Sequence, residues 1–249
     1  MSEHPPKRQR MSTVSMVDSK LDITGKTVKI KVTQGSDTQV FLVHENVLKK
    51  GSSPFFKARL RKEWIAISGG DEAPIVVDGH RPQTFELYVK WLYSGVFDLE
   101  QKGWTDGTFD LEQNGWTGLV SAYILGDEIL DREFQNSILA ATINQSASGS
   151  FAVPGSRAVN MAYESLPEGS PLRRFFVYIF AIALVPKAVE ESLDERYHHE
   201  FLLEVVMAMK KSQEGRKAGP GEAWPVRIKD YMLKDVEVDG RDGGAKNKA

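Results

Sequence analysis

Residues 41–48 change from a strand pattern to a helix pattern within eight positions, Phe41-Leu42-Val43-His44-Glu45-Asn46-Val47-Leu48. Residues 39–43 are rich in β-branched and aromatic side chains, which favour a strand. Residues 45–50 then place Val47 and Leu48 on one face of a short helix, which Gly51 ends. The stretch therefore predicts a strand that leads directly into a helix.

A second strand is predicted just upstream. Val28, Ile30 and Val32 alternate with polar residues, and this period of two is typical of a half-buried strand. Residues 34–37, Gln-Gly-Ser-Asp, form a turn signal between the two strands. The two strands are therefore expected to pair as a β-hairpin.

Helix signals follow Gly51. Ser53 suits an N-cap and Pro54 the first helical position. Apolar side chains then continue at helical spacing, at Phe55, Phe56, Leu60 and Trp64.

After a break at residues 68–71, residues 74–77 predict a short apolar strand. Pro82 opens a helix that is expected to run through Tyr93 and to end at Ser94-Gly95.

This order of elements resembles the BTB/POZ fold, in the form abundant in filamentous fungi. The resemblance is carried by residues 28–32, 41–48, 52–58 (Ser-Ser-Pro-Phe-Phe-Lys-Ala), 75–77, 85–95 (Phe-Glu-Leu-Tyr-Val-Lys-Trp-Leu-Tyr-Ser-Gly) and 125–130 (Leu-Gly-Asp-Glu-Ile-Leu). It implies an α+β fold, with a short three-stranded sheet flanked by a helical cluster and an α-helical C-terminal extension. It also implies structural signature residues, namely His44, Leu48, Ser53, Phe55, Phe56, Trp91, Leu92, Tyr93 and Gly95.

A duplication follows the Pro82 helix. The segment Phe97-Asp98-Leu99-Glu100-Gln101-Lys102-Gly103-Trp104-Thr105 recurs twelve residues later as Phe109-Asp110-Leu111-Glu112-Gln113-Asn114-Gly115-Trp116-Thr117. Repeat architectures need periods of roughly 20–50 residues and at least three units, so we expect a duplication within a loop. The alternatives for Trp104 and Trp116 are an exposed contact site or scattered surface residues.

The chain divides into segments of different composition. We expect a disordered basic tail over 1–20, a BTB/POZ domain over 21–145 with a loop insertion near 97–118, a helical extension over 146–211, and a mostly flexible tail over 212–249. Residues 189–211 form the longest amphipathic stretch, with apolar residues every four positions at Leu193, Tyr197, Phe201, Val205 and Met209.

Composition excludes several classes of protein. The absence of cysteine rules out disulfides, thiolate nucleophiles and thiolate metal sites. The net charge of −2 gives no overall attraction to nucleic acid. Residues 175–185 are eleven consecutive apolar residues, whereas a membrane span needs about 20, so a buried helix is expected.

Motifs that imitate enzyme sites are incomplete. Residues 23–27 resemble the end of a phosphate-binding loop, but Lys20 stands where that motif needs glycine. His44-Glu45 and His199-Glu200 begin like a zinc-protease helix, but each lacks the second histidine four residues on. The sequence therefore predicts no enzyme, no catalytic residue, no metal and no cofactor.

The resemblance implies a protein–protein interaction module whose candidate partners are other proteins and, through dimerisation, a second copy of the chain. One alternative is a substrate adaptor of a cullin-type ubiquitin ligase, with a cullin as partner and with Phe56, Leu60 and Trp64 as contact residues or, more simply, as core. The other is a nuclear transcription or chromatin cofactor that uses the basic tail at Lys7-Arg8-Gln9-Arg10 as an address. We expect no sequence-specific nucleic-acid binding and a cytoplasmic or nuclear location.

Overall fold

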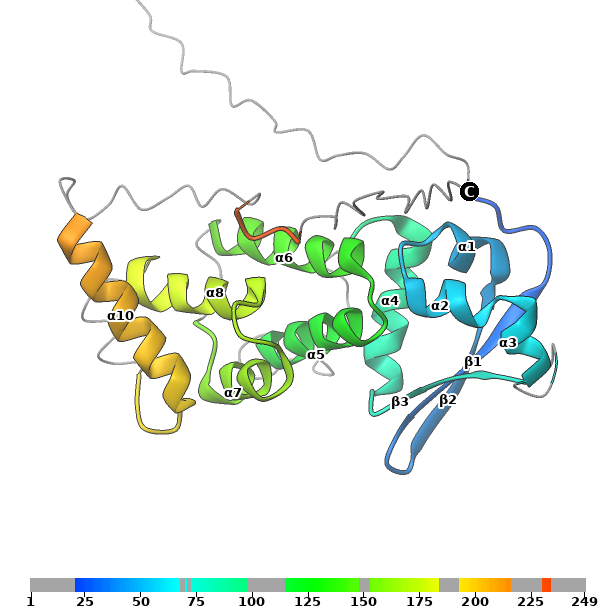
Figure 1. Ribbon diagram of the computed structural model, residues 1–249, viewed down its shortest axis with the longest axis horizontal. Coiled ribbons are helices and arrows are strands. Elements are labelled where there is room, and N and C mark those ends of the chain that lie inside the picture. The colour runs from blue at the N-terminus through cyan, green and yellow to red at the C-terminus, as the bar shows by residue number, and fades with distance from the viewer. Residues whose placement is uncertain are drawn as a thin grey trace, which may run out of the picture.

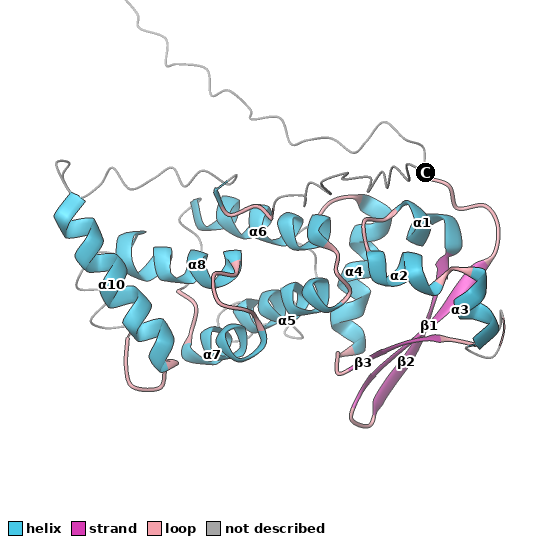
Figure 2. Cartoon of the chain, in the orientation of Figure 1, coloured by secondary structure: helices cyan, strands magenta, loops and turns pink. Residues whose placement is uncertain are grey.

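The computed structural model describes residues 21–67, 70, 73–97, 115–147, 153–183, 193–215 and 230–233. Within them the protein is a mixed α+β structure with one small sheet. The molecule is elongated, with the sheet at one end and the last long helix at the other (Figures 1 and 2). The expected α+β class is therefore confirmed.

The sheet is built on the predicted hairpin. Strands β1 (Thr27–Gln34) and β2 (Asp37–His44) are antiparallel, and β3 (Ile75–Asp78) joins β1 on its other side in parallel. The strand order is β2-β1-β3. Gly35 takes a positive φ of 59° in the turn, a conformation that glycine adopts without steric cost.

Four short or medium helices adjoin the sheet. They are α1 (Glu45–Lys50), α2 (Pro54–Arg59), α3 (Lys62–Ile67) and α4 (Pro82–Ser94). The predicted start of the second helix at Pro54 is confirmed, but the helix ends at Arg59 and a separate helix begins at Lys62. Helix α4 packs on β1 and β2, and Gly95 ends it with a left-handed φ of 69°.

The second half of the described chain is helical. It contains α5 (Gly115–Glu128), α6 (Arg132–Ala147), α7 (Ser156–Ser165), α8 (Pro171–Tyr178), a π-helical turn η1 (Ile179–Ala183) and α10 (His199–Gly215). One continuous cluster of buried side chains extends from Ile30 on β1 to Val205 on α10. The C-terminal helices therefore share their core with the sheet region.

Two helix starts differ from the predictions. Helix α5 begins at Gly115, inside the expected loop insertion, because Trp116 is buried against the α8 ring of Phe176 at 5.4 Å. Helix α10 begins at His199 and not near residue 189, because residues 193–198 form turns. Asp194 holds one of these turns by accepting a 2.9 Å hydrogen bond from the Arg196 backbone N–H.

The predicted tails are only partly described. Residues 1–20 and 234–249 lie outside the described residues, whereas α10 continues past 211 to Gly215. Residues 230–233 return to the helical body, where the Leu233 N–H donates to Asn136 Oδ1 at 2.8 Å. The Tyr231 ring lies 5.6 Å from that of Phe175. This short segment is therefore docked on α6 and α8.

Candidate functional site

His44 and Tyr93 join the sheet to α4. The His44 backbone N–H donates to the Tyr93 hydroxyl at 3.0 Å, and that hydroxyl lies 2.7 Å from His44 Nδ1. An oxygen that accepts from the backbone can donate its own proton to the imidazole. His44 is therefore a hydrogen-bonded residue at the edge of the core, which fits its expected structural role.

Ser53 fixes the start of α2. Its buried hydroxyl accepts from the Phe56 N–H at 3.3 Å and donates to the Ile129 carbonyl at 2.6 Å. The first bond caps the helix, and the second ties α2 to the chain between α5 and α6.

Aromatic rings fill the space between α2, α4 and α6. The Phe56 and Tyr88 rings stack at 5.9 Å, and the Trp91 ring lies 5.9 Å from that of Tyr88. The Tyr88 hydroxyl donates to the buried Asp131 carboxylate at 2.9 Å, and Trp91 Nε1–H donates to Ser137 at 3.0 Å. Burial, followed by the Asp131 charge, raises the pKa of Tyr88 well above its ordinary value. The cluster packs α2, α4 and α6 together, and the polar groups of Tyr88, Asp131 and Trp91 each have a hydrogen-bond partner.

The remaining signature residues also have structural positions. Leu48 is buried, Leu92 and Phe55 are partly buried against the core, and Gly95 supplies the left-handed end of α4.

The residues predicted at a partner surface differ in how far they are exposed. Phe56 and Trp116 are 0% and 6% exposed, so the core alternative for Phe56 is confirmed, whereas the surface position expected for Trp116 is wrong. Phe56 is an inward-facing residue of α2, and Trp116 packs under α8. Leu60 is partly buried, Trp64 is 47% exposed, and Trp104 lies outside the described residues.

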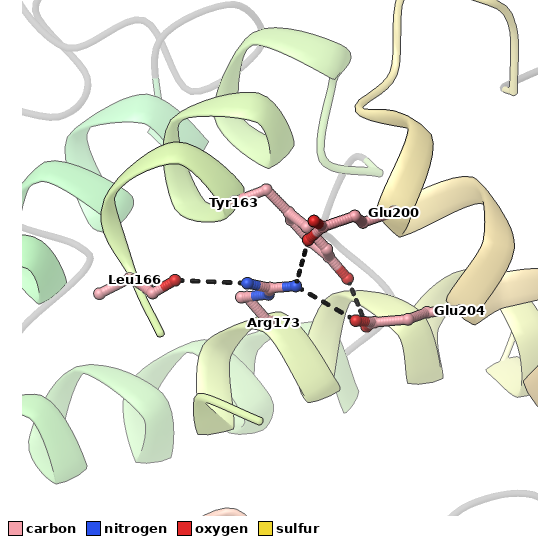
Figure 3. A network of polar contacts seen from close by, with 5 residues as sticks. All are labelled: Tyr163, Leu166, Arg173, Glu200 and Glu204. Atoms are coloured by element: carbon pink, nitrogen blue, oxygen red, sulfur yellow. Dashed lines mark hydrogen bonds and ion pairs between the residues drawn. The ribbon is translucent and has the colours of Figure 1, made fainter. Parts of the chain in front are cut away.

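A buried arginine holds α10 on the helical body. Arg173 on α8 reaches Glu200 and Glu204 on α10 at 3.0 and 3.2 Å, and it donates to the Leu166 carbonyl at 3.3 Å (Figure 3). Its guanidinium lies 3.9 Å from the centre of the Tyr163 ring, and the Tyr163 hydroxyl donates to Glu204 at 2.7 Å. Burial alone would lower the pKa of Arg173, but Glu204 and the other neighbours raise it on balance. The network therefore keeps a charged arginine inside the protein and joins α8 to α10. We call this set of contacts the Arg173 latch.

A histidine and a glutamate lie in direct contact between the start of α4 and the end of α5. Buried His80 lies 2.7 Å from Glu128, through Nε2 and Oε2. No group of three or more histidine, aspartate or glutamate side chains within the described residues is arranged to hold a metal ion.

The outer face of the sheet exposes three apolar side chains around the lysines of its central strand. Val40, Leu42 and Val76 are 52%, 62% and 50% exposed. The strand register places Val40 and Val76 on either side of Lys31 of the central strand, and places Leu42 opposite Lys29. Successive residues on a strand point to opposite faces. The unbroken apolar run at residues 40–43 is therefore the signal in the sequence that could have revealed this surface.

Helix α10 also carries an exposed apolar stripe. Leu203, Val206 and Met207 are 58%, 63% and 69% exposed, while Phe201 and Val205 face the core. The two exposed apolar surfaces therefore lie at opposite ends of the molecule (Figure 1).

None of the helices in the described part of the chain combines the length and apolar character that a membrane crossing requires. A scan of the sequence against protein-family models and a search of curated proteins each found no match.

Proposed function

We propose that this chain is a non-enzymatic protein–protein interaction module of the BTB/POZ type. The order of elements supports the family assignment: a hairpin, short helices, a third strand and a long helix are followed by further helices. The signature residues support it as well, since His44, Ser53 and Trp91 join different elements.

One observation carries the interaction role, namely the apolar outer face of the sheet formed by Val40, Leu42 and Val76. Val40 and Leu42 lie on one face of β2, and Val76 lies on β3 across Lys31 of the central strand. Exposed apolar side chains leave unfavourable contact with water, and a partner that covers them removes it. Each side chain that becomes fully covered contributes about 1 kcal/mol to binding, since half of its area is already buried. A partner with a complementary apolar surface is therefore expected to bind here.

The test is a quantitative affinity purification from cells that express the protein naturally. Wild type is compared with Leu42→Glu, which places a charge on the outer face of the sheet. The matched control is Leu203→Glu, a similarly exposed leucine on α10.

Partner proteins enriched with wild type and with the control, but lost with Leu42→Glu, support the proposal. Enrichment of no protein, or equal enrichment with all three baits, overturns it. A cullin among the enriched proteins would assign the adaptor role to this module, and chromatin proteins would assign the nuclear role.

A further inference from the structure

The structure describes the two ends of the duplicated segment. Phe97 of the first copy is buried 5.9 Å from the Phe134 ring, and Trp116 of the second copy is buried beside Phe176. Each copy has its Phe and its Trp seven positions apart, so a single copy could supply both rings. Their counterparts Trp104 and Phe109 lie between them in the sequence, outside the described residues.

The intervening segment and the sheet region have opposite charges. Residues 98–114 contain one lysine and five acidic residues, which gives a net charge of −4. Residues 21–67 contain nine lysines and arginines against four acidic residues, a net charge of +5. Charges of opposite sign steer association and favour contact between these two segments.

A cavity of about 320 Å³ lies in the basic region, where the start of β1 meets α2, α3 and the start of β3. Leu60, Trp64 and Val76 provide apolar walls, and Lys26 and Arg59 provide positive charge. Val76 also belongs to the apolar outer face of the sheet. The cavity is therefore continuous with the face that carries the proposed function.

The pairing of β1 with β3 ends at this cavity. Strand β1 begins at Thr27, but β3 pairs only with Ile30–Thr33. Residues 27–29 therefore have β2 on one side and, within the described chain, no strand paired on the other. Ala73 and Pro74, which lead into β3, line the cavity together with Thr27 and Val28.

Arg59 places a positive charge at the cavity, next to two aromatic rings. Its guanidinium lies 3.5 Å from the centre of the Phe55 ring and 5.3 Å from that of Trp64. Among the described residues it makes these ring contacts but no ion pair or hydrogen bond. Partial burial lowers the pKa of Arg59, because it removes water from the guanidinium. A carboxylate at this position would restore the lost interaction.

We propose that this cavity binds the acidic segment around residues 109–112 of a second copy of the chain. Phe109-Asp110-Leu111-Glu112 alternates apolar and acidic side chains, so an extended segment presents one kind to each side. Phe109 and Leu111 contact the apolar walls, and Asp110 or Glu112 pairs with Arg59. The inference rests on the proposed function, because it names one partner of the same interaction surface.

The experiment measures self-association of the full-length chain by light scattering over a range of concentrations. One variant, Arg59→Gln, impairs the cavity, and another, Asp110→Asn with Glu112→Gln, impairs the segment. Each is expected to weaken self-association at least tenfold, whereas Lys57→Gln, which removes an exposed α2 charge that does not line the cavity, leaves it unchanged.

Mixing the two impaired variants identifies the contact. One retains an intact segment and the other an intact cavity, so the mixture is expected to associate although neither variant does so alone. Failure of the mixture to associate overturns the inference, as does a wild-type chain that stays monomeric at every concentration. Circular dichroism checks that each variant is folded, and Lys26→Glu replaces Arg59→Gln if the latter unfolds.

The deletion of residues 98–109 provides an independent test. It joins Phe97 to Asp110 and leaves one complete copy, whose Phe and Trp both belong to the core. The deletion variant keeps Asp110, Leu111 and Glu112, but it confines them to a short link between the buried Phe97 and Trp116 and removes Phe109. It is therefore expected to fold and to remain monomeric, and a folded variant that associates like wild type contradicts the inference. If self-association fails while partner enrichment still depends on Leu42, this inference falls and the proposed function stands.

Discussion

At the scale of single residues, the buried Ser53 hydroxyl has two roles in the fold. Ser53→Ala removes the cap of α2 and leaves the Ile129 carbonyl without its donor. We expect the free energy of unfolding to fall by about 1–3 kcal/mol, measured by chemical denaturation. Ser165→Ala, at the exposed end of α7, is the control and should change it by less than about 0.5 kcal/mol. Equal effects of the two substitutions would contradict the assigned role of Ser53.

The pKa of Tyr231 predicts how the stability of the protein changes at alkaline pH. Burial, followed by the neighbouring Tyr178, raises the pKa of Tyr231 to about 12. The pKa in the unfolded chain is about 10, so the folded protein favours the neutral phenol. This stabilisation is complete below about pH 10 and is lost as the pH rises through the folded value of about 12.

Tyr231→Phe keeps the ring beside Phe175 and removes the titrating hydroxyl. The variant is expected to lose less stability than wild type between about pH 9 and pH 11, in guanidinium denaturation at each pH. Parallel losses in the two proteins would show that Tyr231 does not contribute.

At the scale of elements, α5 and α6 approach each other closely at Gly126. A Cβ at this position would lie 2.7 Å from Gln135 Cγ and 3.2 Å from Phe134 Cδ1. Gln135 cannot move away easily, because it is buried and its amide donates to Asp127 at 3.2 Å. Overpacking costs about 1–3 kcal/mol, which exceeds the gain of about 1 kcal/mol from replacing a helical glycine.

We therefore expect Gly126→Ala to lower the thermal midpoint. The control is Gly155→Ala, where an added Cβ meets no atom within 4 Å and φ is −73°. A Gly126→Ala protein as stable as wild type would show that the two helices can separate without cost.

Helix α10 depends on Arg173 for its docking. Lysine at this position keeps a positive charge but cannot contact Glu200, Glu204 and the Leu166 carbonyl together. Because both glutamates are partly exposed, solvent screening limits the expected loss for Arg173→Lys to about 1–2 kcal/mol.

Hydrogen exchange tests this latch directly. Amides of α10 should exchange faster in Arg173→Lys, while amides of α4 keep their wild-type rates. Arg196→Lys is the matched control, since Arg196 is exposed and pairs with Asp194 in the preceding turn. Unchanged exchange in α10 would contradict the role of the latch.

At the scale of the whole molecule, local patterns predicted the elements better than their packing. The alternation at Val28–Val32 and the Ser53-Pro54 start signal depend on near neighbours, and the strand and helix appear where expected. Trp116 was expected at the surface because nothing near it in sequence reveals Phe176, 60 positions later. The Arg173 latch and the parallel pairing of β3 likewise depend on residues far apart in sequence.

The candidate surface was predictable only in part. Phe56 and Trp64 had the same two alternatives, a contact residue or a core residue, and the structure exposes Trp64 but buries Phe56. The apolar outer face of β2 could have been recognised from Val40 and Leu42, which alternate with Phe41 and Val43. The strands that flank this face are set by tertiary pairing, so its extent could not be predicted from one sequence.

The central claim is that the outer face of the sheet binds a protein partner. Hydrogen–deuterium exchange of the full-length chain, alone and saturated with its most strongly enriched partner, tests this claim most directly. We expect slower exchange in β2, β3 and the neighbouring α3, with α7 and α10 unchanged. A saturated complex that protects other elements and leaves β2 and β3 at their original rates would contradict the claim.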